Sequence, residues 1–209
     1  MAIDRAMMAD EFTRARPSGG FRLIYADPPW SFANFSAAGE RKNPKAHYGC
    51  ESLDDLAQMP VGLLAGRDCV LAIWATFPML AEGMALLKAW GFTYKTGGAW
   101  GKLSKTGEKL AFGTGYIFRS AAEILLVGTT GHPEWGNRHT RNFWPAPIRE
   151  HSRKPDKVRD DLAALVPGPR IELFAREAAP GWACWGNETD KFRSERNGGT
   201  ADGAYFALS

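Results

Sequence analysis

The chain has 209 residues, of which 44% are hydrophobic and 23% charged, a composition typical of one ordinary globular domain. No apolar stretch reaches the roughly 20 residues that a membrane-spanning helix needs, and the N-terminal segment lacks the apolar centre of a secretory signal, so we expect a cytoplasmic protein. The three cysteines are widely spaced and outside any Cys-x-x-Cys pattern, which argues against a disulfide framework, and a net charge of +3 is too small to indicate a nucleic-acid partner by itself.

Strand-like and helix-like segments alternate along the chain. Short apolar runs at residues 21–26 and 69–75 are typical of buried strands in a parallel sheet. A helix is predicted to begin at Pro78 and to end before Gly91, because Pro favours the first turn of a helix and Gly the position just past its end. Further strands are predicted at 94–100, 123–128 and 170–175, and a second helix at 155–166. This alternation predicts an α/β fold with a mostly parallel sheet.

The two ends of the chain are polar and rich in Gly, Ser, Asn or charged residues. Polar segments at the ends of a chain are usually poorly ordered unless they are tied to the fold. We therefore expect a single domain over residues 1–209, with flexible tails at 1–19 and 192–209.

The tetrad Asp27-Pro28-Pro29-Trp30 directly follows the first predicted strand. Ligands of open α/β sheets bind outside the carboxyl ends of the strands, so Asp27 is expected in a cleft. Consecutive prolines stiffen the turn and lack N–H donors, which leaves an array of hydrogen-bond acceptors. Such an array suits an aromatic amine, because its two N–H groups need acceptors when its delocalised lone pair attacks. The alternative is a strand-terminating Asp in a proline turn beside a Trp that only packs.

Several short segments follow one another between residues 21 and 188. They are ADPPW at 26–30, HYG at 47–49, LAIWAT at 71–76, EILLVGTTG at 123–131, HSRKPDKV at 151–158, RIELFAR at 170–176 and GWACWGNE at 181–188. In this order they resemble the MT-A70-like family, which includes the catalytic subunit of the eukaryotic mRNA adenosine methyltransferase and bacterial and phage DNA adenine methyltransferases. The resemblance implies a single-domain, Rossmann-like methyltransferase sheet that uses S-adenosylmethionine, with a circularly permuted order in which the catalytic turn precedes the cofactor strand.

The resemblance also implies the roles of individual residues. The catalytic turn is Asp27, Pro28, Pro29 and Trp30, in which Asp27 and Pro28 hold the amine, Trp30 stacks on the base, and Asp27 also receives the amino group of the cofactor. Lys154 matches a lysine that pairs with the methionine carboxylate and borders the target adenosine. The other implied cofactor contacts are Glu172, Phe174, Arg176, Asn187 and Glu188. Glu172 is unusual without the resemblance as well, because an acidic residue in an apolar strand must be paired or lie at the strand's tip.

Substrate contacts are expected from Trp30, Lys154 and two further residues that the resemblance implies, Tyr48 and Glu123. Basic segments with interleaved aromatic residues are typical of nucleic-acid surfaces, although each such run is also typical of a solvated loop. The candidates are Arg41 and Lys42 in the segment 31–45, Arg138 and Arg141 among Trp135, Phe143 and Trp144 in the segment 132–151, and the run Lys102, Lys105 and Lys109. No metal is expected, because the four histidines form no metal-ligand pattern and methyl transfer from a sulfonium needs none.

The sequence therefore predicts an S-adenosylmethionine-dependent methyltransferase acting on adenine N6 in DNA, with the base flipped out or single-stranded. DNA is preferred to RNA because no further RNA-binding module accompanies the domain. Two alternatives stay open: an RNA adenosine methyltransferase, and a noncatalytic nucleic-acid-binding partner on the same fold. The second is disfavoured because this chain keeps the acidic residue that such partners have lost. A nicotinamide enzyme is also disfavoured, since no G-x-G-x-x-G follows the first strand.

Overall fold

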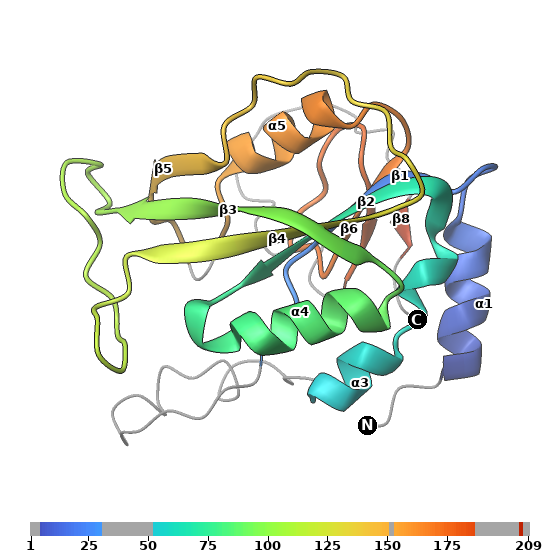
Figure 1. Cartoon of the computed structure of the whole chain (residues 1–209), viewed down its shortest axis with the longest axis horizontal. Helices are drawn as coiled ribbons and strands as arrows, with labels where there is room; N and C mark the ends of the chain where they lie inside the picture. The colour runs from blue at the N-terminus through green and yellow to red at the C-terminus, as the bar shows by residue number, and fades with distance from the viewer. Residues whose placement is uncertain (1–4, 31–51, 151–152, 187–204, 207–209) are drawn as a thin grey trace.

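The computed structural model describes residues 5–30, 52–150, 153–186 and 205–206. The strands are β1 (Phe21–Ala26), β2 (Ala65–Ala75), β3 (Thr93–Leu103), β4 (Ala122–Thr130), β5 (Phe143–Pro147), β6 (Arg170–Leu173), β7 (Ala183–Trp185) and β8 (Tyr205–Phe206). The helices are α1 (Arg5–Ala15), α3 (Leu53–Gln58), α4 (Leu80–Ala89) and α5 (Asp156–Leu165), with short 3-10 helices η2 (Val61–Leu63) and η3 (Phe77–Met79). In this part of the chain the strands form one sheet of order β5-β3-β4-β2-β1-β6-β7-β8 (Figure 1).

The sheet is mostly parallel, as predicted. β1 is central and pairs in parallel with β2 on one side and β6 on the other, whereas β4 runs antiparallel to its neighbours β2 and β3. The late strand β6 thus lies directly beside β1, as the permuted order of the motifs predicts. Ala26 pairs with Leu173, so the carboxyl ends of these two strands are level. A crevice between strands whose connections leave in opposite directions is the usual ligand site of such sheets.

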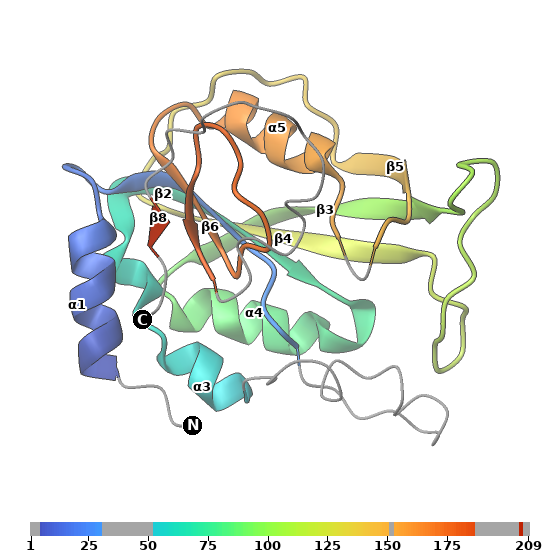
Figure 2. The ribbon, with the colours of Figure 1, turned by 180° about the vertical axis from the view of Figure 1, so that it is seen from behind.

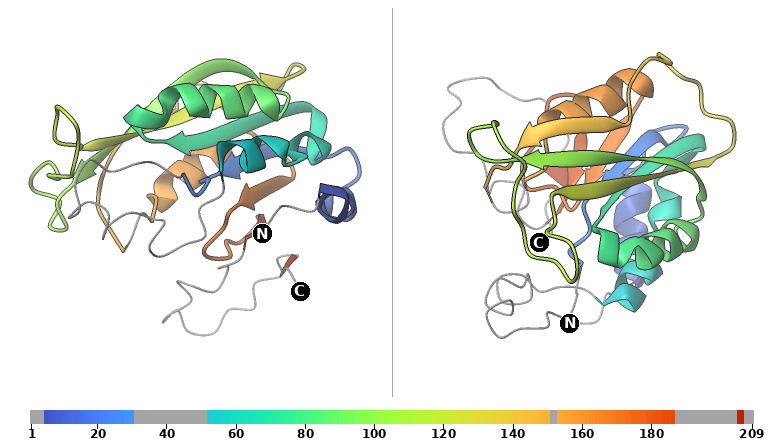
Figure 3. Two further views of the ribbon diagram at one scale, coloured as in Figure 1. Left: turned by 90° about the horizontal axis from the view of Figure 1, so that it is seen from below. Right: turned by 60° about the vertical axis from the view of Figure 1, so that its left-hand side comes forward.

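Helices cover both faces of the sheet, and Figures 2 and 3 show α4 and α5 on opposite faces. Alternate side chains of β1 point to opposite faces of the sheet and pack in two different cores. Ile24 and Ala26 pack in a core that includes residues of α1, α3 and α4, whereas Leu23 and Tyr25 pack in a second core with α5. A strand buried on both faces must be apolar at every position, which explains the unbroken apolar run of β1. None of the described helices is long and apolar enough to cross a membrane.

Both predicted helices and all the predicted strands are present, with shifted ends. The strand predicted over 170–175 ends at Leu173, because Phe174 has a φ of 59° and leaves the extended conformation. The helix predicted from Pro78 starts as η3 and becomes α-helical at Leu80. The sequence-based interpretation missed α1, α3, β5, β7 and β8.

The expected N-terminal tail is wrong for residues 5–15, which form α1. The helix is polar overall, but Phe12 is fully buried and meets the ring of Trp185 edge-on at 5.4 Å between centroids. Trp185 also donates from Nε1 to Glu11 Oε1 at 3.1 Å. One buried aromatic and one hydrogen bond therefore dock this segment. The expected C-terminal tail likewise contains β8, whose backbone pairs with β7.

Candidate active site

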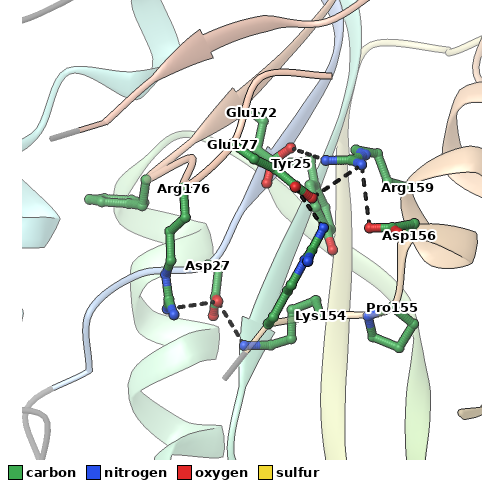
Figure 4. A pocket seen from close by; sticks show the side chains of 11 residues that line it. Tyr25, Asp27, Lys154, Pro155, Asp156, Arg159, Glu172, Arg176 and Glu177 are labelled. Carbon is green, nitrogen blue, oxygen red and sulfur yellow. Dashed lines mark hydrogen bonds and ion pairs between the residues drawn. The ribbon is translucent and has the colours of Figure 1, made fainter. Parts of the chain in front are cut away.

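Asp27 stands at the carboxyl end of β1, where the apolar strand gives way to the Pro28-Pro29 turn. The turn closes tightly, because the backbone N–H of Trp30 donates to Pro28 O at 2.9 Å. The Asp27 side chain remains 18% exposed and faces the crevice between β1 and β6 (Figure 4). The predicted cleft position of this carboxylate is thereby confirmed.

Four further charged side chains form a continuous series with Asp27. Lys154, just before α5, places Nζ 2.7 Å from Asp27 Oδ2 and 3.3 Å from Glu123 Oε2 on β4. Lys102 on β3 pairs with the other oxygen of Glu123. On the opposite side, Arg176 Nη2 lies 3.4 Å from Asp27 Oδ2. Positive and negative groups alternate along this series, so each carboxylate lies between two cations.

Lys154 and Glu123 are buried and keep their charge. Burial alone lowers the pKa of Lys154, but the attraction of Asp27 and Glu123 outweighs it and the pKa lies above its usual value. Burial likewise favours a raised pKa for Glu123, and the neighbouring Lys154 and Lys102 reverse this, so that its pKa is lowered. Lys154 is also 5.6 Å from the ring centroid of Trp74, a cation–π distance. The site thus fixes an ammonium group beside the Asp27 carboxylate.

Glu172 lies on β6 and faces α5. Its Oε2 is 3.3 Å from Nη1 of Arg159, which also contacts Asp156 at 3.4 Å and Glu177 at 3.6 Å. Burial raises the pKa of Glu172 to about 7, although Arg159 opposes the shift. The requirement that this carboxylate be paired is confirmed, and its charge responds to pH near neutrality.

Phe174, which lines the site, carries backbone strain. A φ of 59° is rare for a residue with a side chain and costs about 1–3 kcal/mol, which the surroundings must offset. Here the next residue, Ala175, donates its N–H to Trp185 O at 3.0 Å, and the Phe174 ring meets Trp185 edge-on. A Cβ on Gly186 would lie 2.6 Å from Ala175 O, so only glycine lets the two segments approach. The strain turns the chain so that Arg176 reaches Asp27.

Most of these side chains line one pocket that opens to solvent, whereas Glu123 and Lys102 are not part of its lining. Asp27, Lys154 and Arg176 form one end, and Glu172 and Arg159 lie further along (Figure 4). Phe174 also belongs to the lining. The remaining lining residues are Tyr25, Arg153, Pro155, Asp156 and Glu177. The pocket therefore offers an ammonium, carboxylates and guanidinium groups within a few ångströms, which suits a ligand that carries both charges and hydroxyl groups.

The structure brings together most of the predicted site residues that it describes. Asp27, Lys154, Glu172, Phe174 and Arg176 share the pocket, and Glu123 touches it through Lys154. Five predicted residues lie outside the described part of the chain: Arg41, Lys42, Tyr48, Asn187 and Glu188.

The stacking role predicted for Trp30 does not fit its position. Only 7% of Trp30 is exposed, it packs in the core shared with α3 and α4, and its Nε1 donates to Trp74 O at 2.8 Å. A ring held in this way cannot offer a face to a base. Trp30 instead anchors the Pro28-Pro29 turn to the neighbouring strand β2.

Replacing Trp30 with Phe is expected to lower the free energy of unfolding by about 1–3 kcal/mol, because the Trp74 carbonyl loses a buried donor. The measurement is chemical denaturation followed by circular dichroism. Trp135→Phe is the matched control, since that side chain is 39% exposed. An unchanged unfolding free energy for Trp30→Phe, with weaker substrate binding, would restore the stacking role.

The predicted contacts Arg138 and Arg141 are not brought to the pocket. β4 runs antiparallel to β2, so the segment after it starts at the edge of the sheet opposite Asp27. Gly136 N–H donates to the carbonyl of Leu165, the last residue of α5, at the helix end remote from Lys154. Trp144, from the same predicted surface, is buried and donates to Asp161 at 2.8 Å. This segment covers α5 and is not a wall of the pocket.

The sequence-based interpretation missed Arg153, Arg159 and Glu177 as members of the site. Arg153 binds Glu177 at 2.7 Å, and both Arg159 and Glu177 line the pocket. The sequence contains one pattern from which Arg159 could have been predicted. Arg159 follows Asp156 by three residues, which places both side chains on one face of the predicted helix, and the unpaired Glu172 needed a cation.

A model of the MT-A70 family matches residues 21–188. Among curated relatives, the Type II methyltransferase M.MunI of Mycoplasma sp is 30% identical over 197 residues, which span 86% of this chain and 82% of the relative. The N(6)-adenosine-methyltransferase MT-A70-like protein of Arabidopsis thaliana is 30% identical over 84% of this chain and 24% of its own length. The human N(6)-adenosine-methyltransferase catalytic subunit METTL3 is 29% identical over 82% of this chain and 29% of its own length. The chain thus spans most of the first relative and under a third of the two others.

Proposed function

Because the chain belongs to the MT-A70 family, we propose that it transfers a methyl group from S-adenosylmethionine to the N6 amine of adenine in DNA. The observation that carries this proposal is the placement of Asp27. Its carboxylate ends β1, begins the Asp-Pro-Pro-Trp turn and is held between Lys154 and Arg176 at the mouth of the pocket.

The residues of the pocket fit S-adenosylmethionine, which supplies a methyl group on a positively charged sulfur. Its methionine end carries an ammonium and a carboxylate, for which Asp27 and Lys154 offer partners of opposite charge. Its ribose carries hydroxyl groups, and a buried acidic residue such as Glu172 is the usual partner of a ribose diol in sheets of this kind. Phe174 and Arg176 border the same space. We assign Asn187 and Glu188 to the adenine ring, as the family resemblance implies.

Asp27 and the Pro28 carbonyl then hold the target amine. Each accepts one N–H bond, and the carboxylate stabilises the positive charge that grows on nitrogen as the N–C bond forms and the S–C bond breaks. The extra proton leaves to water after transfer. Correct orientation of the two reactants contributes on the order of 7–11 kcal/mol to the lowered barrier. Glu123 and Lys154 border the base, and Trp30 keeps the turn rigid.

Two relationships support DNA as the substrate. The relative that this chain matches along most of its length is named a Type II methyltransferase, and the bacterial and phage members that the sequence resembles act on DNA. The relatives named N(6)-adenosine-methyltransferases are matched over only 24% and 29% of their lengths. RNA is the alternative substrate, and the same pocket geometry serves both.

Methyl transfer from labelled S-adenosylmethionine to adenine-containing DNA and RNA, run in parallel, tests the proposal. Nucleoside digestion and chromatography identify the product. N6-methyldeoxyadenosine from DNA supports it, and label confined to RNA selects the alternative. Intact binding of S-adenosylmethionine without any transfer indicates a noncatalytic nucleic-acid-binding protein and contradicts it.

Affinity for S-adenosylmethionine is expected to fall as the pH drops below about 7, by about tenfold per pH unit when only the ionised Glu172 binds the ribose. The sign follows because the pKa of this carboxyl is raised by burial, so acidification protonates it within this range. Isothermal titration calorimetry on either side of pH 7 measures the effect. Glu172→Gln is expected to bind more weakly and to lose this pH dependence. The same pH profile in both proteins would exclude Glu172 as the titrating group.

A further inference from the structure

The loop that joins β3 and β4, residues 104–121, exposes a cluster of large apolar side chains. The exposed fractions are 71% for Leu110, 81% for Phe112, 58% for Tyr116, 88% for Ile117 and 84% for Phe118. Figures 1 and 3 show this loop, which we call the β3–β4 loop, projecting beyond the strands that it connects. A cluster of this kind on a folded domain marks an interaction site.

The loop has a defined backbone, although its side chains face solvent. Ser104 N–H donates to Lys109 O at 2.7 Å, and Ala111 N–H donates to Lys102 O at 2.8 Å. Further out, Gly113 N–H donates to Ser120 O at 3.0 Å. A Cβ on Gly115 would lie 2.0 Å from Phe118 O, so this tight turn requires glycine. The turn presents Tyr116, Ile117 and Phe118 together.

The base of the loop lies beside the catalytic turn. Lys102, near the end of β3, pairs with Glu123 at the start of β4, and Glu123 pairs with Lys154, which is 2.7 Å from Asp27. The β3–β4 loop therefore leaves the sheet at the same edge as Asp27. A long ligand that enters the pocket at this edge can therefore extend along the loop.

The charges of the loop indicate the kind of partner. It carries three cations, Lys105, Lys109 and Arg119, and one acid, Glu108. The guanidinium of Arg119 lies over the ring of Phe112, 5.3 Å from its centroid, so a cation and an aromatic ring with one open face are held together. Aromatic faces interleaved with cations are the arrangement that binds unstacked bases and their phosphates. A symmetric contact with a second copy would bring the same positive loops together, which like-charge repulsion opposes.

We propose that the β3–β4 loop is a nucleic-acid-binding element. Phe112, Tyr116 and Phe118 stack on bases next to the target adenine, and the cations of the loop bind the adjoining phosphates. Apolar rings inserted between base steps unstack them, so the loop also stabilises the extruded state that the pocket needs. The proposal rests on the proposed function only for the identity of the target base.

The test compares double variants in fluorescence anisotropy with labelled single-stranded and duplex DNA that contain adenine. Phe112→Ala with Phe118→Ala is expected to raise the dissociation constant on the order of tenfold to a hundredfold. Phe112→Leu with Phe118→Leu keeps an apolar surface but loses the stacking faces, so it is expected to be similarly weakened. Phe112→Tyr with Phe118→Tyr is expected to bind like the wild type. Met7→Ala with Leu63→Ala is the matched control, because those exposed apolar residues lie on α1 and η2.

Salt dependence separates the two parts of the loop. In a plot of the logarithm of the DNA-binding constant against the logarithm of the salt concentration, the aromatic variants are expected to keep the wild-type slope. Lys105→Gln with Lys109→Gln is expected to lower the magnitude of that slope by about 2. Calorimetry with S-adenosylmethionine and thermal melting confirm that each variant is folded.

Unchanged DNA affinity in the alanine and leucine variants overturns the proposal. A dimeric wild type, measured by light scattering, that becomes monomeric in the alanine variant with unchanged DNA affinity assigns the loop to a second copy and also overturns it. If the aromatic variants bind DNA more weakly but the wild type transfers no methyl group, the loop is a DNA-binding element and the proposed function is wrong. The two proposals can therefore fail separately.

Discussion

Replacing Asp27 with Ala is expected to abolish measurable methyl transfer, and Asp27→Asn to slow it by about 10²- to 10³-fold. Either change removes the carboxylate that we propose accepts an N–H bond from the amine and stabilises its growing positive charge. Asparagine keeps the shape and an acceptor oxygen but loses the charge, so the difference between the two variants isolates the electrostatic part. Single-turnover transfer to DNA under saturating S-adenosylmethionine is the measurement.

Calorimetry on the Asp27 variants shows whether the loss concerns chemistry or cofactor binding. Binding of S-adenosylmethionine is expected to persist with a weakening of about tenfold, because Lys154 and Arg176 remain in the pocket and one charge-assisted hydrogen bond is lost. Asp10→Asn on exposed α1 is the matched control for the loss of one negative charge. Measurable turnover in Asp27→Ala, or turnover near the wild-type rate in Asp27→Asn, would overturn the catalytic assignment.

Replacing Lys154 with Met is expected to abolish transfer and also to lower the free energy of unfolding by about 3 kcal/mol. Its side chain is only 8% exposed, and its ammonium lies between the carboxylates of Asp27 and Glu123. Removing one member of a buried ion pair leaves its partner without compensation. For a chain of this size the expected fall in melting temperature is roughly 6–12 °C. Urea denaturation and differential scanning calorimetry at neutral pH measure both quantities.

A double-mutant cycle tests the origin of this loss. Glu123→Gln in the Lys154→Met background is expected to recover part of the stability, because one of the two facing carboxylates is then neutral. The deficit of Lys154→Met is also expected to shrink at acidic pH, because Lys154 lowers the pKa of Glu123 and its contribution to stability is lost as that carboxylate becomes protonated. Lys154→Arg, which keeps the charge, is the conservative control. A change within about 0.5 kcal/mol for Lys154→Met would show that the pair contributes nothing to stability.

The position of Trp30 could not be predicted from the motif. A Trp next to a catalytic carboxylate suggested stacking, because the motif gives the residue type and its distance along the chain. Its χ angles and neighbours are set by β2, 44 residues later, whose Trp74 carbonyl accepts its indole N–H. No local pattern could have predicted that partner.

The sequence by itself determined the strands β1, β2 and β6, the helix α5 and the end of β1 at Asp27. These features depend on local patterns: an apolar run, a proline turn and a periodic helix face. The resemblance of the ordered motifs also implied that Lys154, Glu172 and Arg176 lie around one cofactor, and the structure places all three in one pocket.

Only the tertiary structure decided which charged groups meet. The reversal of β4 carried Arg138 to the far edge and brought Glu123 between Lys102 and Lys154. The packing of α5 on β6 gave Glu172 its partner Arg159, and the docking of one aromatic, Phe12, made a helix of a polar N-terminal segment. The physical reason is the same in each case. Local propensity fixes an element, whereas strand direction, register and long-range packing fix its partners, and these depend on residues remote in the sequence.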